Sequence, residues 1–198
     1  MARRHLLARR FMAGALLCAG FCLVPGAEAG DAAPPHGQPE VKVFSVKGSE
    51  VPKVVVRAVI HQPPKKVWQI VSDCGQYKQH MPHIAASKQI KKDGNKVTCE
   101  VTISMPFPFS NLTAVTEAVH EESEGGFSRK WKLVRGDYTM NNGSWEVKPL
   151  DAAGTKSIVT YTVHADPKTA VPDWIREAAQ KKALPEMIAR VESEAGKI

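Results

Sequence analysis

The hydrophobic pattern of this chain changes period once, near Pro172, and this change constrains the fold more than any other feature. From residue 51 to residue 165, apolar side chains mostly alternate with polar ones, which is typical of strands with one covered face. After Pro172, apolar side chains recur at helical spacing. They are Trp174, Ile175, Ala178, Leu184, Met187, Ile188 and Val191. Because one helix cannot cover a flat sheet of six or seven strands, the sheet is expected to curl around it.

The strands can be placed from their alternation and from the turns between them. The first, Val51 to His61, is rich in β-branched residues and is stopped by Pro63 and Pro64. Asp93-Gly94-Asn95 and Glu124-Gly125-Gly126 predict hairpin turns farther along the chain. Later strands are expected over residues 84–92, 96–105, 112–122 and 127–135, from Asn142-Gly143 onward, and over 156–165. The sequence therefore predicts an α+β fold with a curved antiparallel sheet of six to seven strands.

A short pair of helices is expected after the first strand, and a bend is expected in the last helix. The two prolines suit the first turn of a helix, where a missing N–H does no harm. This helix should end at Gly75, and a second short piece should cover residues 76–80. In the C-terminal helix, Pro185 has no N–H to donate to Lys181, so we expect the helix to bend there.

Residues 1–29 have the pattern of a secretory signal peptide. Four arginines precede the apolar run Phe11 to Val24, and Ala27-Glu28-Ala29 fits a cleavage region. The competing interpretation is an uncleaved membrane anchor, but the run is shorter than the roughly 20 residues that span a bilayer. We therefore expect an exported protein, periplasmic or extracellular, that is cleaved near Ala29. Residues 30–48, rich in Ala, Pro and Gly, are expected to form a flexible lead-in to one domain over residues 49–198.

The charge and the motifs of the chain exclude several classes of function. Part of the formal net charge of +7 belongs to the leader, and the rest forms no dense basic run, so no nucleic-acid partner is expected. Transient contact with anionic lipid headgroups is compatible with this charge, although a solvated face is the plainer interpretation. The sequence has no nucleophile motif, which argues against a hydrolase. It has no glycine-rich phosphate-binding loop, so no nucleotide cofactor is expected. His80 and His83 flank Pro82 in an irregular stretch, and we expect no metal site there.

Two cysteines, Cys74 and Cys99, lie outside the leader. An oxidising compartment would allow them to form a disulfide. Alternatively, both are buried thiols, which is the usual state of an unpaired cysteine. The sequence leaves both interpretations open.

Three stretches of the sequence are distinctive. They are Val67-Trp68-Gln69-Ile70-Val71-Ser72-Asp73, Met105-Pro106-Phe107-Pro108-Phe109-Ser110-Asn111 and the passage from Val163 to Ile175. In that order, they resemble the first helix of START lipid-binding domains, the segment before one of their central strands, and the passage from their last strand into their last helix. With the order of elements, these stretches resemble the helix-grip fold shared by START domains, polyketide cyclases and birch-pollen-allergen-like proteins. The resemblance covers about residues 51–191.

The resemblance implies that a lipid or other apolar molecule lies between the curved sheet and the C-terminal helix, with the helix as a lid. Burial of such a ligand is worth roughly 25 cal/mol per Å² of apolar surface. The residues expected to line the cavity are Met105, Phe107, Phe109, Trp131, Trp145, Tyr161, Trp174, Ala178, Met187 and Ile188. Each of them also has a plainer interpretation as part of the hydrophobic core.

Two other functions are compatible with the same fold. In a cyclase or dehydratase, Arg135, Asp137, Tyr138 and His164 would supply an acid–base set near the cavity. The stretch Gly136-Asp137-Tyr138 is also where a bend between strands is expected. Export argues against the cyclase, because polyketide-bound acyl carriers are cytosolic. In an interaction module without a ligand, the cavity would be filled by the protein's own side chains.

Overall fold

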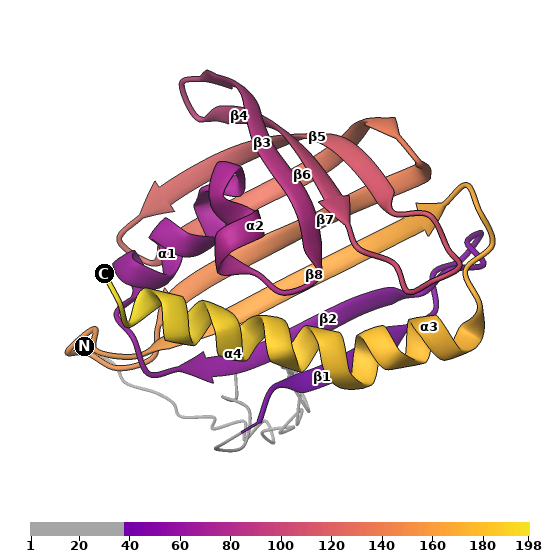
Figure 1. Cartoon of the computed structure of the whole chain (residues 1–198). Coiled ribbons are helices and arrows are strands. Elements are labelled where there is room, and N and C mark those ends of the chain that lie inside the picture. Colours follow the sequence, from indigo (N-terminus) through magenta and orange to yellow (C-terminus); the bar gives the residue numbers. More distant parts are fainter. Residues whose placement is uncertain (1–37) are drawn as a thin grey trace, which may run out of the picture. The chain divides into compact units, whose positions relative to one another are not determined.

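The computed structural model describes residues 38–198, and these form one antiparallel sheet with helices on its concave side (Figure 1). The strands are β1 (Glu40–Phe44), β2 (Lys53–Ile60), β3 (Ile84–Asp93), β4 (Lys96–Ile103), β5 (Leu112–Ser123), β6 (Gly126–Gly136), β7 (Tyr138–Pro149) and β8 (Ser157–Pro167). Their order in the sheet is β1-β2-β8-β7-β6-β5-β4-β3. Hence the long connection from β2 to β3 carries the helices across the sheet.

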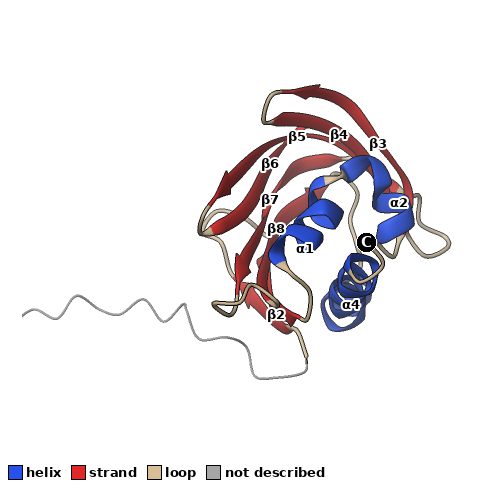
Figure 2. Ribbon diagram, turned by 90° about the vertical axis from the view of Figure 1, so that its left-hand side faces the viewer, coloured by secondary structure: helices blue, strands red, loops and turns tan. Residues whose placement is uncertain are grey.

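The helices between β2 and β3 are α1 (Pro64–Ser72), the 3-10 turn η1 (Cys74–Gln76) and α2 (Tyr77–His80). Figure 2 shows the sheet curling around α1, α2 and the C-terminal helix α4 (Leu184–Ala195). The buried face of α1, which includes Val67 and Val71, joins a core with inward-facing residues of β2, β7 and β8. This arrangement confirms the predicted α+β helix-grip fold.

The sheet has eight strands, which corrects the expected number of six to seven. The additional strand β1 lies within residues 30–48, where the sequence was expected to form a flexible lead-in. It pairs with β2 at the edge of the sheet, from Glu40 opposite Arg57 to Phe44 opposite Lys53. Its side chains are mostly exposed, so it has little of the hydrophobic alternation that predicts a strand. The proposed signal peptide lies outside the described residues.

Strand β7 begins at Tyr138 rather than at Asn142-Gly143, which is a second correction. The chain reverses direction at Gly136 and Asp137, where Asp137 N–H donates to Thr113 O at 2.8 Å. Gly136 has a φ of +136°, and a Cβ there would collide with the carbonyl of Thr113. The turn therefore requires this glycine, whereas Gly143 lies inside the strand.

The C-terminal helix is divided by a π turn, η2 (Ala179–Ala183), which lies between α3 (Asp173–Ala178) and α4 (Figure 1). Pro185 is in the first turn of α4, and the preceding Leu184 N–H donates to Ala179 O. A proline ring clashes with the carbonyl four residues earlier, and a wider turn relieves that clash. The sequence predicts a bend at Pro185; the structure has a π turn just before this residue, which separates α3 from α4. No helix within residues 38–198 is long and apolar enough to cross a bilayer.

Candidate ligand-binding site

A cavity of about 260 Å³ lies between the concave face of the sheet and the helices. Strands β4 to β8 supply Val101, Ile103, Ala114, Thr116, Arg129, Trp131, Tyr138, Asn141, Trp145, Tyr161, Val163 and Ala165. The segment from α2 to β3 supplies Tyr77, Met81, Pro82, His83 and Ile84. The π turn and α4 supply Ala179, Ala183, Leu184 and Met187. The wall is predominantly apolar, as in most small-molecule sites.

Three aromatic rings form one connected part of the wall. The ring of Tyr161 lies 4.5 Å from that of Trp145 and 5.9 Å from that of Trp131, between centroids. Trp131 Nε1 donates to Asn141 Oδ1 at 3.0 Å, which satisfies the indole N–H. Gly143 lies directly under the ring of Trp131, because a Cβ at this position would collide with its Cζ2 atom. The glycine thus allows the indole ring to approach the backbone of β7 closely.

Arg129 is the one arginine of residues 38–198 on the cavity wall, and only 3% of its area is exposed. Its Nε donates to His120 Nε2 and its Nη2 to Cys99 Sγ, both at 3.2 Å. The guanidinium carbon also lies 5.7 Å from the ring centroid of Tyr77 and 5.6 Å from that of Trp131. These distances are within the range of cation–π attraction. Among residues 38–198, no carboxylate lies within salt-bridge distance of this side chain.

Sequence reasoning missed Arg129 as a site residue, although a signal was present. Alternation along β6 places Arg129 on the same face as Trp131, which the sequence predicts to line the cavity. A charged residue on such a face is rarely fully buried unless it is paired. That rarity should have marked Arg129 as a functional candidate.

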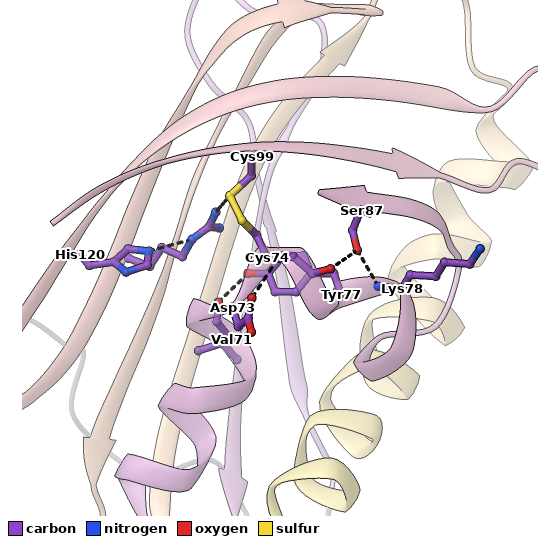
Figure 3. Close-up of a disulfide and its surroundings, with 10 residues drawn as sticks. Val71, Asp73, Cys74, Tyr77, Lys78, Ser87, Cys99 and His120 are labelled. Carbon is purple, nitrogen blue, oxygen red and sulfur yellow. Dashed lines mark hydrogen bonds between the residues drawn. A yellow bond between two sulfur atoms is a disulfide. The ribbon is translucent and has the colours of Figure 1, made fainter. Parts of the chain in front are cut away.

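A disulfide joins Cys74 to Cys99, with a Cα–Cα distance of 6.2 Å (Figure 3), and its Cys99 sulfur accepts the hydrogen bond from Arg129. Of the two interpretations left open by the sequence, the structure has the disulfide. It ties η1 to β4 and so fixes the helical segment over one end of the cavity. Next to it, the Tyr77 hydroxyl donates to Val71 O at 2.5 Å (Figure 3). Burial raises the pKa of Tyr77, so its hydroxyl is neutral and acts as a donor.

Four of the ten residues expected to bind ligand line the cavity, namely Trp131, Trp145, Tyr161 and Met187. The others lie elsewhere. Ile188 is buried in the core, and Ala178 is exposed. Met105 and Phe109 line a second hollow of about 420 Å³, between the loop after β4 and the residues after β8.

Phe107 and Trp174 lie on the surface, with 96% and 56% of their areas exposed. The ring of Phe109 lies 6.3 Å from that of Trp174, between centroids. The apolar side chains of the proline-aromatic loop and of α3 therefore meet outside the cavity. They gather near the second hollow, whose wall also carries Asp137 and Lys168.

The four polar residues proposed for an acid–base set do not meet in one place. Tyr138 lines the cavity, where burial and the nearby charge of Asp137 raise its pKa to about 12. The Asp137 carboxylate accepts the N–H of Thr113 at 2.8 Å and lines the second hollow. The exposed Arg135 lies 3.9 Å from Glu100. His164 Nε2 lies 3.1 Å from both Ser49 Oγ and Val51 O. This arrangement offers no acid–base pair across the cavity.

The chain resembles proteins of known structure and matches a family model. The model described as "Polyketide cyclase / dehydrase and lipid transport" matches residues 60–192. A search of curated proteins found no match. A STAR-related lipid transfer protein from Xanthomonas axonopodis is 22% identical, with a TM-score of 0.70 over 83% of this chain and 97% of that one.

Two further structures share the fold at lower identity. Human StAR-related lipid transfer protein 5 is 13% identical, with a TM-score of 0.71 over 86% of this chain and 88% of that one. The Zhui aromatase/cyclase from Streptomyces is 12% identical, with a TM-score of 0.59 over 73% and 93%. These likenesses agree with the fold derived above. The chain belongs to the polyketide cyclase/dehydrase and lipid transport family, and its described part is a START-like helix-grip domain.

Proposed function

We propose that the protein binds a lipid or other apolar small molecule in the cavity and carries it outside the cytoplasm. The observation that carries this proposal is the 260 Å³ hollow lined by side chains such as Ile103, Trp131 and Met187. An interaction module with a closed interior would fill this space with its own side chains. The apolar wall favours a guest that loses its contact with water on binding.

The π turn and α4 form the movable side of this proposed carrier. Ala183, Leu184 and Met187 cover the cavity, and the π turn interrupts regular helical hydrogen bonding next to them. A shift of this segment would open the cavity without disturbing the sheet. The exposed Phe107 and Trp174 provide apolar contacts for a transient encounter with a lipid surface.

Two features support export. The first is the signal-like pattern of residues 1–29. The second is the disulfide between Cys74 and Cys99, because disulfides persist mainly in oxidising compartments.

The test is to express the full-length chain in a bacterium, fractionate the cells and analyse the purified protein by native and intact mass spectrometry. We expect a periplasmic or secreted product that starts near Gly30 and carries a bound lipid. A cytoplasmic product with an intact leader would contradict export. A protein that copurifies with no lipid and takes up neither fatty-acid nor sterol probes would contradict carriage.

A cyclase or dehydratase is the second candidate, favoured by the position of Tyr138 on the cavity wall. Among the residues of that wall there is no Asp or Glu to accept or relay a proton. Replacement of Tyr138 by Phe separates the two functions. A carrier should keep its ligand affinity, whereas an enzyme that uses this hydroxyl should bind its substrate and lose turnover.

A further inference from the structure

We propose that the ligand is a single-chain amphiphile with a carboxylate, of the fatty-acid type, and that Arg129 binds the carboxylate while the chain lies along Trp131 and Met187. This inference rests on the proposed function and specifies the class of ligand. Its basis is a buried cation at the cavity that no carboxylate of residues 38–198 pairs with.

The positive charge of Arg129 is buried at the cavity. A guanidinium stays protonated in proteins, so its positive charge is buried with the side chain. An unpaired buried charge is costly, and proteins normally provide an opposite charge. Glu122, which lies two residues after His120 and on the same face of β5, instead accepts a hydrogen bond from Trp68 Nε1 at 3.0 Å. The described residues therefore leave a positive charge for a ligand to neutralise.

The guanidinium of Arg129 has hydrogen-bond donors that the described residues do not use. Nε donates to His120 and Nη2 donates once to Cys99, which leaves both hydrogens of Nη1 and one of Nη2. Within residues 38–198, the only inaccessible side-chain polar atom without a partner is Nδ1 of His80. Nη1 is not one of these atoms, and Arg129 lines the cavity, so we take Nη1 as a donor open to a ligand there. Nη1 and Nη2 together match the two oxygens of a carboxylate.

The position of the guanidinium is fixed before any ligand binds. His120 and the disulfide sulfur hold two of its nitrogens, and the rings of Tyr77 and Trp131 flank it. Burial, together with the charges of Arg129 and Lys92, lowers the pKa of His120 to about 4 against the opposing effect of Glu122. His120 is thus neutral at pH 7 and accepts the Arg129 hydrogen bond rather than repelling it. A fixed donor pair loses little entropy when an anion binds.

The volume of the cavity and the single charge of Arg129 limit the size and charge of the ligand. The cavity of about 260 Å³ is slightly below the roughly 300–1,000 Å³ of typical ligand pockets, which favours one hydrocarbon chain over two. A carboxylate has a single negative charge and balances one guanidinium. A phosphate monoester carries about −1.5 to −2 at pH 7 and would leave negative charge buried beside apolar residues. A carboxylate therefore fits better.

The test compares palmitic acid with 1-hexadecanol, which has the same chain without the charge. Each is titrated at pH 7.4 into the delipidated protein, which is expressed from the full-length chain and purified after removal of its leader. Tryptophan fluorescence is the readout. We expect the acid to bind at least about tenfold more tightly than the alcohol, as expected for hydrogen bonds to charged groups. Arg129→Gln should abolish this preference and leave the affinity for the alcohol within about threefold.

Arg135→Gln is the matched control, because Arg135 lies on the same strand with an exposed side chain. It should keep the preference for the acid. Equal affinities of acid and alcohol in the wild type, or an unchanged preference in Arg129→Gln, would overturn the assignment and leave carriage intact. Failure of both ligands to bind the wild type would overturn both proposals. Because the wild-type comparison needs no variant, it decides the matter even if Arg129→Gln does not fold.

Discussion

Among single residues, His120 is one whose protonation state decides whether it can accept a hydrogen bond from Arg129. Its Nε2 accepts a hydrogen bond from Arg129, and its ring lies edge-on to Trp68 at 5.1 Å. The neutral imidazole is required, because a protonated ring has no acceptor and would place a second cation beside the guanidinium. Burial, followed by the charges of Arg129 and Lys92, lowers the pKa of His120 to about 4 and so keeps the imidazole neutral.

The first prediction is that stability falls as the pH is lowered from about 6.5 toward 4. In the unfolded chain His120 has the ordinary pKa near 6.5, so between these values the unfolded state binds more protons than the folded state. The contribution of neutral His120 to the free energy of unfolding is therefore fully present above about pH 6.5 and is lost as the pH falls toward 4. Urea denaturation at a series of pH values measures this dependence. His120→Gln, which retains an acceptor, should have a smaller decrease, and an unchanged decrease would contradict the assignment.

The second prediction concerns Gly143, on which the ring of Trp131 rests. A Cβ at this position would collide with both the indole and the carbonyl of Thr162. Gly143→Ala should therefore destabilise the protein by about 1–3 kcal/mol and displace Trp131 from the cavity wall. Thermal unfolding and the tryptophan emission spectrum check this result. Gly125→Ala, in a turn with room for a methyl group, is the control and should change neither property.

Among elements, the disulfide is the link between the helical segment and the sheet. Cys74 and Cys99 are separated by 25 positions, and a loop of this length corresponds to a stabilisation of roughly 3.5 kcal/mol in the chain-entropy model. The third prediction is that replacing both cysteines by Ala lowers the free energy of unfolding by about 2–4 kcal/mol. Urea denaturation measures the loss. Reductant should lower the free energy of unfolding of the wild type and leave that of the double variant unchanged. If reductant changes both free energies equally, the result counts against a disulfide.

The elements differ in how far the sequence could predict them. The hairpins β3–β4 and β5–β6 follow from alternation and from glycine turns, and the irregularity of the C-terminal helix follows from Pro185. Strand β1 was missed because its side chains are mostly exposed, so no buried face imposes a period on its sequence. The start of β7 was misplaced because Asn142-Gly143 resembles a turn, whereas Gly143 is required by the ring packed on it.

The site was predictable where residues lie on strands and much less so where they lie on loops. Alternation gives the direction of Trp131, Trp145 and Tyr161, which all line the cavity. In the loop that contains Phe107 no period applies, and this side chain points to solvent. Arg129 was passed over because a charged residue is expected on the wet face, although its position in β6 places it inside.

For the whole described domain, the last prediction asks whether ligand affinity depends on the volume enclosed by sheet and helix. Ala183 lies on the cavity wall in the π turn, so Ala183→Phe should fill part of the 260 Å³ and weaken palmitic acid binding by about tenfold or more. Ala178→Phe is the control, because Ala178 is exposed on the same helical segment and does not line the cavity. Fluorescence titration gives the affinities, and circular dichroism verifies that both variants fold.

If Ala183→Phe binds palmitic acid as the wild type does, the ligand must lie elsewhere, with the hollow beside Phe109 as the next place to examine. If both variants lose affinity equally, the effect comes from the helix surface rather than from the enclosed volume.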